Sequence, residues 1–294
     1  MRRNILAIAA LAACMISGGA HGAELDAQLA SASDMDSAIE LCGYSNACCC
    51  NTGMPTVVFD VDFMFLKYNQ SGGVQSSDAG EMIGNKGNAE FDFEFSPRFT
   101  LGVENCDGLG ARVRYWYFDE SAPTTGSGGF VAVDAYTFDA EIYKRVQIAR
   151  STFIEGFGGI RWSEFNLYDD TDLEWTVDGV GITTGLELSQ YIRCNHRLYA
   201  RSRLSVVAGD VFLADEGDLD DSTGMGFDNT SLQVELAAGY EGRTRIGRGV
   251  TLVYGAGAEL QNWSDAAIKG DASDEAYLTD AGWSGFTFRL GAEY

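Results

Sequence analysis

The carboxyl-terminal stretch Phe286–Tyr294, which reads FTFRLGAEY, indicates the fold of the whole chain. Apolar residues occupy every second position from Phe286 to Tyr294, and Thr287, Arg289, Gly291 and Glu293 fill the places between them. This period of two predicts a strand whose two faces meet different solvents. Such a strand needs a partner for its free edge, and the natural partner is the first strand, around Val57–Phe65. Their pairing would close a barrel.

The same alternation recurs along the chain from Thr56 onward. It predicts ten strands joined by long loops and short turns in strict alternation. The strands are Val57–Phe65, Asn88–Glu104, Ala111–Asp119, Phe130–Ile148, Thr152–Phe165, Gly181–Ile192, Arg197–Val211, one containing Leu232–Tyr240, Val250–Trp263 and one after Gly282. Pro97 lies inside the second strand and predicts a bulge or two shorter pieces there.

Alternating long and short connections place all the long ones at one end, as in outer-membrane barrels with periplasmic turns and extracellular loops. An even number of strands brings both ends of the chain to the periplasmic side. The predicted fold is therefore all-β, a transmembrane antiparallel up-and-down barrel over residues 56–294. Residues 23–55 form a short Cys-rich periplasmic extension before it, and residues 1–22 form a signal peptide.

The signal peptide is read from one apolar run, Ile5–Ile16, with Arg2 and Arg3 before it and small residues after it. Cleavage before Ala23 is the first interpretation. The stretch Leu11–Cys14 also resembles the lipobox at which bacterial lipoproteins are cut and lipidated, so lipidation at Cys14 is the alternative. In both cases the protein leaves the cytoplasm.

The chain contains 20 Lys and Arg residues against 43 Asp and Glu residues, for a net charge of −23. This charge excludes nucleic acid as a partner. Acidic residues gather in the predicted loops and could bind divalent cations, or they are simply solvated. The short turns carry the basic residues Arg150, Arg193, Arg197, Arg243, Arg245 and Arg248.

Charged residues on the polar faces of the strands are predicted to line the lumen. They are Asp60, Asp62, Arg112, Arg114, Glu141, Glu155, Arg161, Glu187, Arg201, Arg203, Glu235, Glu259 and Arg289. In the closing pair, Asp60 and Asp62 are candidate counter-charges for Arg289. The lumen charges either line a pore or pair across the lumen, because ten strands lie near the closed end of the range of barrel sizes.

The cysteines outside the signal peptide are candidates for disulfides in an oxidising compartment. They are Cys42, Cys48, Cys49, Cys50, Cys106 and Cys194. Cys106 and Cys194 fall in predicted short turns, on the same side as the extension. We therefore expect the extension to be tied to at least one of these turns, with the connectivity left open.

The stretch Glu104–Phe118, ENCDGLGARVRYWYF, together with Ser96–Arg98, resembles the second hairpin of a family of planctomycete outer-membrane barrels. That family is similar to the Legionella-type pore-forming major outer-membrane proteins. The resemblance implies a porin-like role in the outer membrane. The carboxyl-terminal alternation also resembles the signal by which the barrel-assembly machinery recognises its substrates, with Tyr294 where phenylalanine is more usual.

The first functional hypothesis is therefore a porin-like barrel for passive passage of small solutes, cations among them. The alternative is a non-conducting structural or surface-interaction barrel of the cell envelope, and a secreted soluble barrel is a third. Outer-membrane lipid and the assembly machinery are the expected partners. No enzyme activity, cofactor or metal site is expected, since His21 lies in the signal peptide and His196 in a short turn.

Overall fold

The computed structural model describes residues 55–71, 74–75, 88–124, 129–169, 173–215, 225–246, 249–269 and 277–294. The predicted signal peptide, the lipobox at Cys14, the extension and its cysteines Cys42, Cys48, Cys49 and Cys50 lie outside these residues. So do the acidic stretches 216–221 and 271–275. Within the described residues, no helix is long and apolar enough to cross a membrane.

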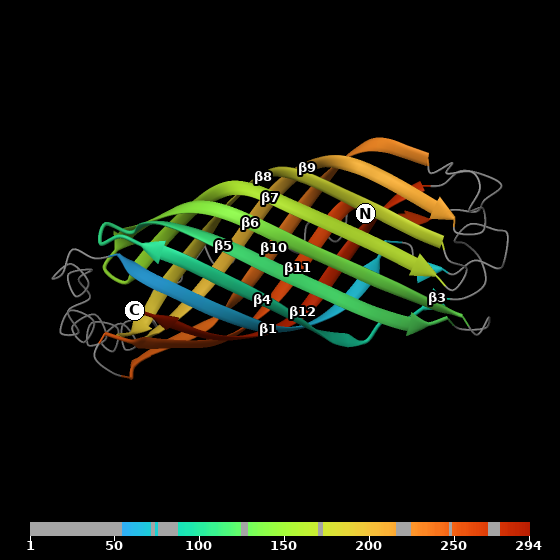
Figure 1. Cartoon of the computed structure of the whole chain (residues 1–294). Coiled ribbons are helices and arrows are strands. Elements are labelled where there is room, and N and C mark those ends of the chain that lie inside the picture. Colours follow the sequence, from blue (N-terminus) through green and yellow to red (C-terminus); the bar gives the residue numbers. More distant parts are fainter. Residues whose placement is uncertain are drawn as a thin grey trace, which may run out of the picture. The chain divides into compact units, whose positions relative to one another are not determined.

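Ten antiparallel strands form one closed barrel, which confirms the predicted fold class (Figure 1). The barrel strands are β1 (Thr56–Gln70), β4 (Phe93–Glu104), β5 (Leu109–Pro123), β6 (Phe130–Ala149), β7 (Thr152–Asp169), β8 (Leu173–Arg193), β9 (His196–Asp215), β10 (Met225–Arg245), β11 (Thr251–Lys269) and β12 (Tyr277–Glu293). The short strands β2 (Val74–Gln75) and β3 (Asn88–Ala89) pair with each other outside the barrel.

The last strand closes the barrel against the first, as the sequence predicts. In the β1–β12 pair, Val61 lies opposite Leu290 and Phe65 opposite Phe286. At the end of the seam, the Val57 amide donates to the Tyr294 carbonyl at 2.7 Å and the Tyr294 amide donates back at 2.9 Å. We call this end, with the connections 105–108, 150–151, 194–195 and 246–250, the turn end, and the opposite end the loop end.

At the loop end several strands extend further than their alternation predicts. β8 begins at Leu173 and not at Gly181, so the connection from β7 is residues 170–172 and not a long loop. The polarity of the outward face changes along β8: Thr176 and Asp178 are polar, whereas Val180 and Ile182 are apolar. Alternation therefore predicts the start of the strand only where its outward face becomes apolar.

Pro97 produces no bulge in the pairing of β4 with β1, where it lies opposite Phe63 in an unbroken register. The other ladder of β4, with β5, begins only at Arg98. Proline has no N–H to give to a ladder, and the hydroxyl of Ser96 donates to the Tyr117 carbonyl at 2.6 Å beside this point. The strand itself is interrupted earlier, at residues 90–92.

That interruption reverses the expected position of Phe91. Alternation from Phe93 and Phe95 places Phe91 on the outer face, yet its side chain is buried inside the barrel. The chain at residues 90–92 is not a strand, so the period of two does not continue across it. Phe93 and Phe95 are exposed on the outside as predicted.

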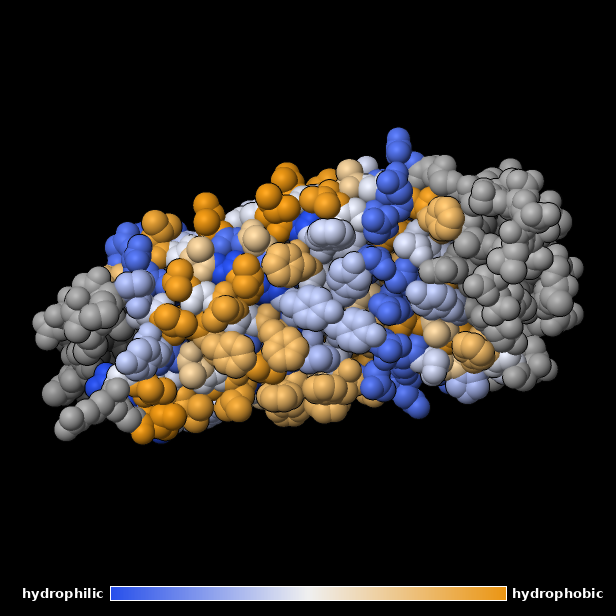
Figure 2. All heavy atoms as spheres, viewed as in Figure 1, coloured by the Kyte–Doolittle hydropathy of each residue, from blue (hydrophilic) through white to orange (hydrophobic). Residues whose placement is uncertain are grey.

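Between the two ends, the outside of the barrel carries an apolar belt, visible in Figure 2. Its most exposed members include Ile142, Ile160, Ile182 and Leu186. On β6 nine residues, positions 135–143, separate the outward polar residues Asp134 and Lys144, and apolar outward residues continue beyond Lys144 at Val146 and Ile148. A membrane-spanning strand needs about 9–11 residues. The barrel is therefore of the transmembrane type.

A hydrophilic band crosses the outer surface on the loop-end side of this belt (Figure 2). Outward carboxylates on neighbouring strands lie directly opposite one another there: Asp119 faces Asp134, and Asp210 faces both Asp178 and Asp228. Glu164 faces Asp178 in the same way. We call Asp119, Asp134, Glu164, Asp178, Asp210 and Asp228 the acidic row. It marks the boundary of the belt on six adjacent strands.

The polarity of the wall inverts near this row. Within the belt the outward residues are apolar and the inward residues are charged. Toward the loop end, inward residues such as Trp175 and Leu167 are buried and apolar, and outward residues such as Thr176 are polar, although Phe130 and Phe212 remain exposed on the outside. The loop-end part of the barrel thus has an apolar interior, and the part within the belt has the polarity of a membrane barrel.

Candidate functional site: the interior of the barrel

Ion pairs fill the interior of the part that lies within the belt. Arg98 is the clearest case, with a side chain only 1% exposed. Its Nη2 donates to Asp62 Oδ2 at 2.7 Å, and its Nη1 donates to Glu259 Oε1 at 2.7 Å. A guanidinium group held between two carboxylates joins β4 to β1 and, across the interior, to β11.

A second cluster surrounds Arg161 on β7, whose side chain is fully buried. Its Nε donates to Asp139 Oδ1 at 2.7 Å, and its Nη2 donates to Glu235. Arg203 shares both carboxylates, with Nη1 3.1 Å from Asp139 and Nε 3.2 Å from Glu235. Charged groups this deep are stable only when paired and hydrogen-bonded. Arg161 meets both conditions, whereas Arg203 is paired but its Nε and Nη2 have no hydrogen-bond partner among the described residues.

The seam between β1 and β12 holds the ion pair predicted from the sequence. Arg289 Nε donates to Asp62 Oδ1 at 2.7 Å, so this counter-charge is confirmed. Asp60 takes another role and lines a small polar cavity near the turn end. Asp62 therefore holds Arg98 on one side and Arg289 on the other, across two strand boundaries.

All the charged residues predicted to line the lumen lie on inward positions, and all except Asp60 take part in an ion pair. The structure adds members that were not among the predicted lumen charges: Arg98, Glu104, Asp139, Arg145, Arg197, Glu241, Arg243 and Glu293. Period-two spacing from Glu141 would have found Asp139. The sequence places Arg197 and Arg243 in short turns. In the structure both donate to Glu241 inside the barrel.

The ion-paired charges of the interior balance. Ten arginines and ten carboxylates are involved: Arg98, Arg112, Arg114, Arg145, Arg161, Arg197, Arg201, Arg203, Arg243 and Arg289 with Asp62, Glu104, Asp139, Glu141, Glu155, Glu187, Glu235, Glu241, Glu259 and Glu293. Balanced charges of this kind give the interior little net field with which to attract ions of one sign.

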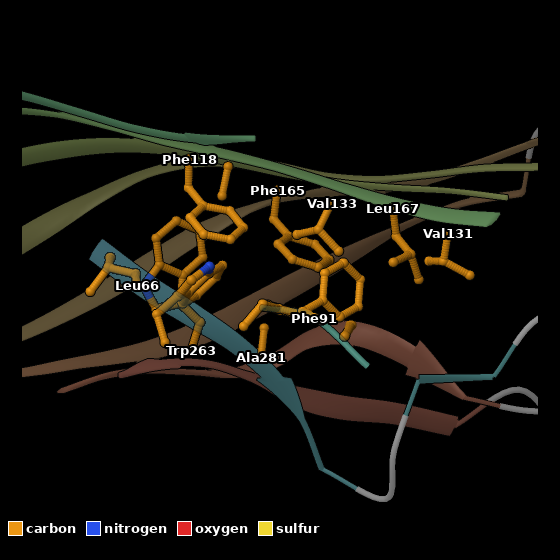
Figure 3. Close-up of a cluster of buried hydrophobic side chains, with 14 of the residues drawn as sticks. Leu66, Phe91, Phe118, Val131, Val133, Phe165, Leu167, Trp263 and Ala281 are labelled. Carbon is orange, nitrogen blue, oxygen red and sulfur yellow. The ribbon is translucent and has the colours of Figure 1, made fainter. Parts of the chain in front are cut away.

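Toward the loop end an aromatic layer fills the interior (Figure 3). Trp283 is at its centre, with ring centroids 5.0 Å from Trp263 and 5.5 Å from both Trp116 and Tyr68. Figure 3 shows Phe118, Phe165 and Trp263 pointing toward one another from different strands. These side chains are at most 2% exposed. Two-residue periodicity predicts which face they occupy, but not that they meet in one layer.

Little empty space remains between these groups. The polar cavity beside Asp60 has a volume of about 70 Å³ and is lined by Arg114, Arg197 and Glu187 among others. That is room for several water molecules, since one water needs about 10–15 Å³ of such volume. A second cavity, of about 10 Å³, lies between Ser163, Gln233 and Trp263.

The described residues hold no group of three or more His, Cys, Asp or Glu side chains that could bind a metal ion. His196 stacks on Tyr240 at the turn end and its Nδ1 is hydrogen-bonded to the Tyr240 hydroxyl. The imidazole ring of His196 is thus part of the packing between β9 and β10. The absence of catalytic activity stays a prediction from the sequence.

The two cysteines of the short turns differ. Cys106, a candidate disulfide cysteine from the sequence, is a free and half-buried thiol. Cys194, in the β8–β9 turn, is not a free thiol. The predicted tie between the extension and a turn now depends on Cys194.

Peptide mapping without reduction tests this tie. We expect a peptide containing Cys194 to be cross-linked to one from residues 42–50, and Cys106 to react with iodoacetamide in the folded protein. Alkylation of Cys194 without prior reduction would show that the extension is not held at this turn.

No protein-family model and no curated protein matches the sequence. Among solved structures, the barrel is similar to the outer membrane protease OmpT from Escherichia coli, with a TM-score of 0.47 and 10% identity over 83% of this chain and 97% of that one. It is also similar to the translocator domain of the autotransporter NalP from Neisseria meningitidis, with a TM-score of 0.45 and 12% identity over 92% and 99%. The fold is a closed antiparallel β-barrel. These similarities are too distant to carry a function.

Proposed function

We propose that this protein is a non-conducting barrel of the bacterial outer membrane, with its turn end in the periplasm. The observation that supports this most is the aromatic layer around Trp283, whose side chains fill the loop-end interior at no more than 2% exposure. An ion would have to pass both this layer and the ion-pair network below it. Hydrophobic constrictions exclude ions by excluding water.

This proposal takes up the second of the two hypotheses from the sequence. The filled interior weighs against the porin-like hypothesis. Membership of the planctomycete barrel family, which suggested that hypothesis, stays a hypothesis. A wall of ten strands gives an interior that side chains can fill, whereas open channels are typical of about sixteen or more. The role that fits is to anchor the amino-terminal segment and the loop-end surface in the envelope.

Planar-bilayer recording of the purified, folded protein tests the proposal. We expect no conductance steps, and no swelling of liposomes containing the protein in a small sugar or salt solution. Folding in the same preparation is checked by heat-modifiable gel mobility. Reproducible steps that depend on protein concentration would overturn the proposal and support the porin-like hypothesis.

A further inference from the structure

The outer surface of the barrel carries a groove that has no role in the proposed function. It lies within the apolar belt across β4 to β8 and has a volume of about 1190 Å³. Ala111, Gly156 and Gly158 form its floor, and Ile142, Ile160 and Leu186 stand around it. Large and small side chains alternate across the strands, since Ile142 lies opposite both Ala111 and Gly158.

The two floor glycines are not required by the packing of the barrel. A Cβ added at Gly156 would meet nothing closer than Leu186 Cδ2 at 3.7 Å, and one at Gly158 nothing closer than the Thr183 carbonyl at 3.4 Å. At Gly159, by contrast, a Cβ would be 1.9 Å from the Ala140 carbonyl oxygen. Glycine within a strand weakens the strand, and it often marks a place where a ligand approaches the backbone.

The position of the groove indicates what occupies it. Its walls are apolar and belong to the belt, so lipid hydrocarbon is the surrounding medium. Lys144 also lines the groove, near the turn end, where its Nζ donates to the Asp107 carbonyl at 2.7 Å and to Asp107 Oδ2 at 2.9 Å. An ammonium group has three N–H donors, so one remains for a further acceptor.

We propose that the groove binds a phospholipid, with one acyl chain over Gly156 and Gly158 and the phosphate at Lys144. The lysine stem follows the apolar wall and brings its charge to the level of the lipid headgroups, as basic side chains do at membrane boundaries. An anionic headgroup such as phosphatidylglycerol suits this site better than a zwitterionic one.

Native mass spectrometry tests the site. The barrel is reconstituted in nanodiscs made of equal parts phosphatidylglycerol and phosphatidylcholine, then released in a mild detergent. We expect the wild-type protein to retain phospholipid, enriched in phosphatidylglycerol. Gly158→Leu should lose the retained lipid, because its side chain would project from the floor of the groove into the path of the acyl chain. Lys144→Gln should still retain lipid but lose about fivefold in preference for phosphatidylglycerol, since the headgroup contact is exposed.

Ser202→Leu is the matched control, because Ser202 is an outward, exposed position on β9 outside the groove. It should retain lipid as the wild type does, and heat-modifiable mobility should show that every variant is folded. Equal retention by Gly158→Leu and Ser202→Leu would overturn the proposal, as would a wild-type barrel that retains no lipid. A wild-type dimer that becomes a monomer on Gly158→Leu would also overturn it, and would assign the groove to a second copy of the chain.

Discussion

Replacing Trp283 by alanine should lower the free energy of unfolding by about 3–5 kcal/mol, the usual cost of truncating a buried tryptophan. The side chain is 1% exposed and its ring contacts Trp116, Trp263 and Phe165. The neighbouring rings come from different strands of a closed wall, so they have little freedom to collapse into the space. Urea unfolding in detergent micelles, followed by heat-modifiable gel mobility, measures the change.

Phe286→Ala is the control on the same strand. The Phe286 side chain is 58% exposed on the lipid-facing surface. Its loss should lower the free energy of unfolding by less, about 1–2 kcal/mol, because the ring leaves water for the micelle on folding but its removal leaves no internal cavity. Equal effects at the two positions would mean that the aromatic layer does not contribute to stability as its burial implies.

Arg161→Met should be similarly destabilising, by about 3–5 kcal/mol, for an electrostatic reason. Arg161 is fully buried and donates to Asp139 at 2.7 Å and to Glu235. Methionine keeps much of the volume but leaves the two carboxylates with Arg203 as a shared partner. The same urea titration measures the loss.

The matched control for charge removal is Lys144→Met. The ion pair of Lys144 with Asp107 has side chains 44% and 63% exposed. Exposed pairs contribute about 0–1 kcal/mol, so this variant should stay close to the wild type. A urea midpoint of Arg161→Met equal to that of the wild type would contradict this prediction. It would show that Arg203 and ordered water can satisfy the buried carboxylates without Arg161.

The sequence predicts the barrel well because two-residue alternation is a local property. It gives the strand number, the closing pair and the inward face, and so it finds Asp62 opposite Arg289. It does not show that Arg98 reaches Glu259, 161 positions away, because that contact depends on the stagger of all the strands between them.

The other errors have local causes. Phe91 changes face because residues 90–92 leave the strand. Alternation predicts a loop where β7 and β8 extend toward the loop end, because their apolar side chains there point inward and no longer outward. Leu167 and Trp175 point into the barrel where Ile160 and Ile182 point out. The sequence prediction takes each face of a strand to meet one environment along its whole length. It therefore misses a strand whose apolar side chains point outward in the belt and inward beyond it.

The reversal of polarity fixes how deeply the barrel is immersed. If it slid toward the loop end, Ile160 and Leu186 would enter water. If it sank, the acidic row would enter hydrocarbon, where a carboxylate on the lipid-facing surface is unfavourable. The loop-end part, which has its own apolar core, therefore stands clear of the bilayer at a fixed height. Whatever binds at the loop end is therefore presented at a constant distance from the lipid surface.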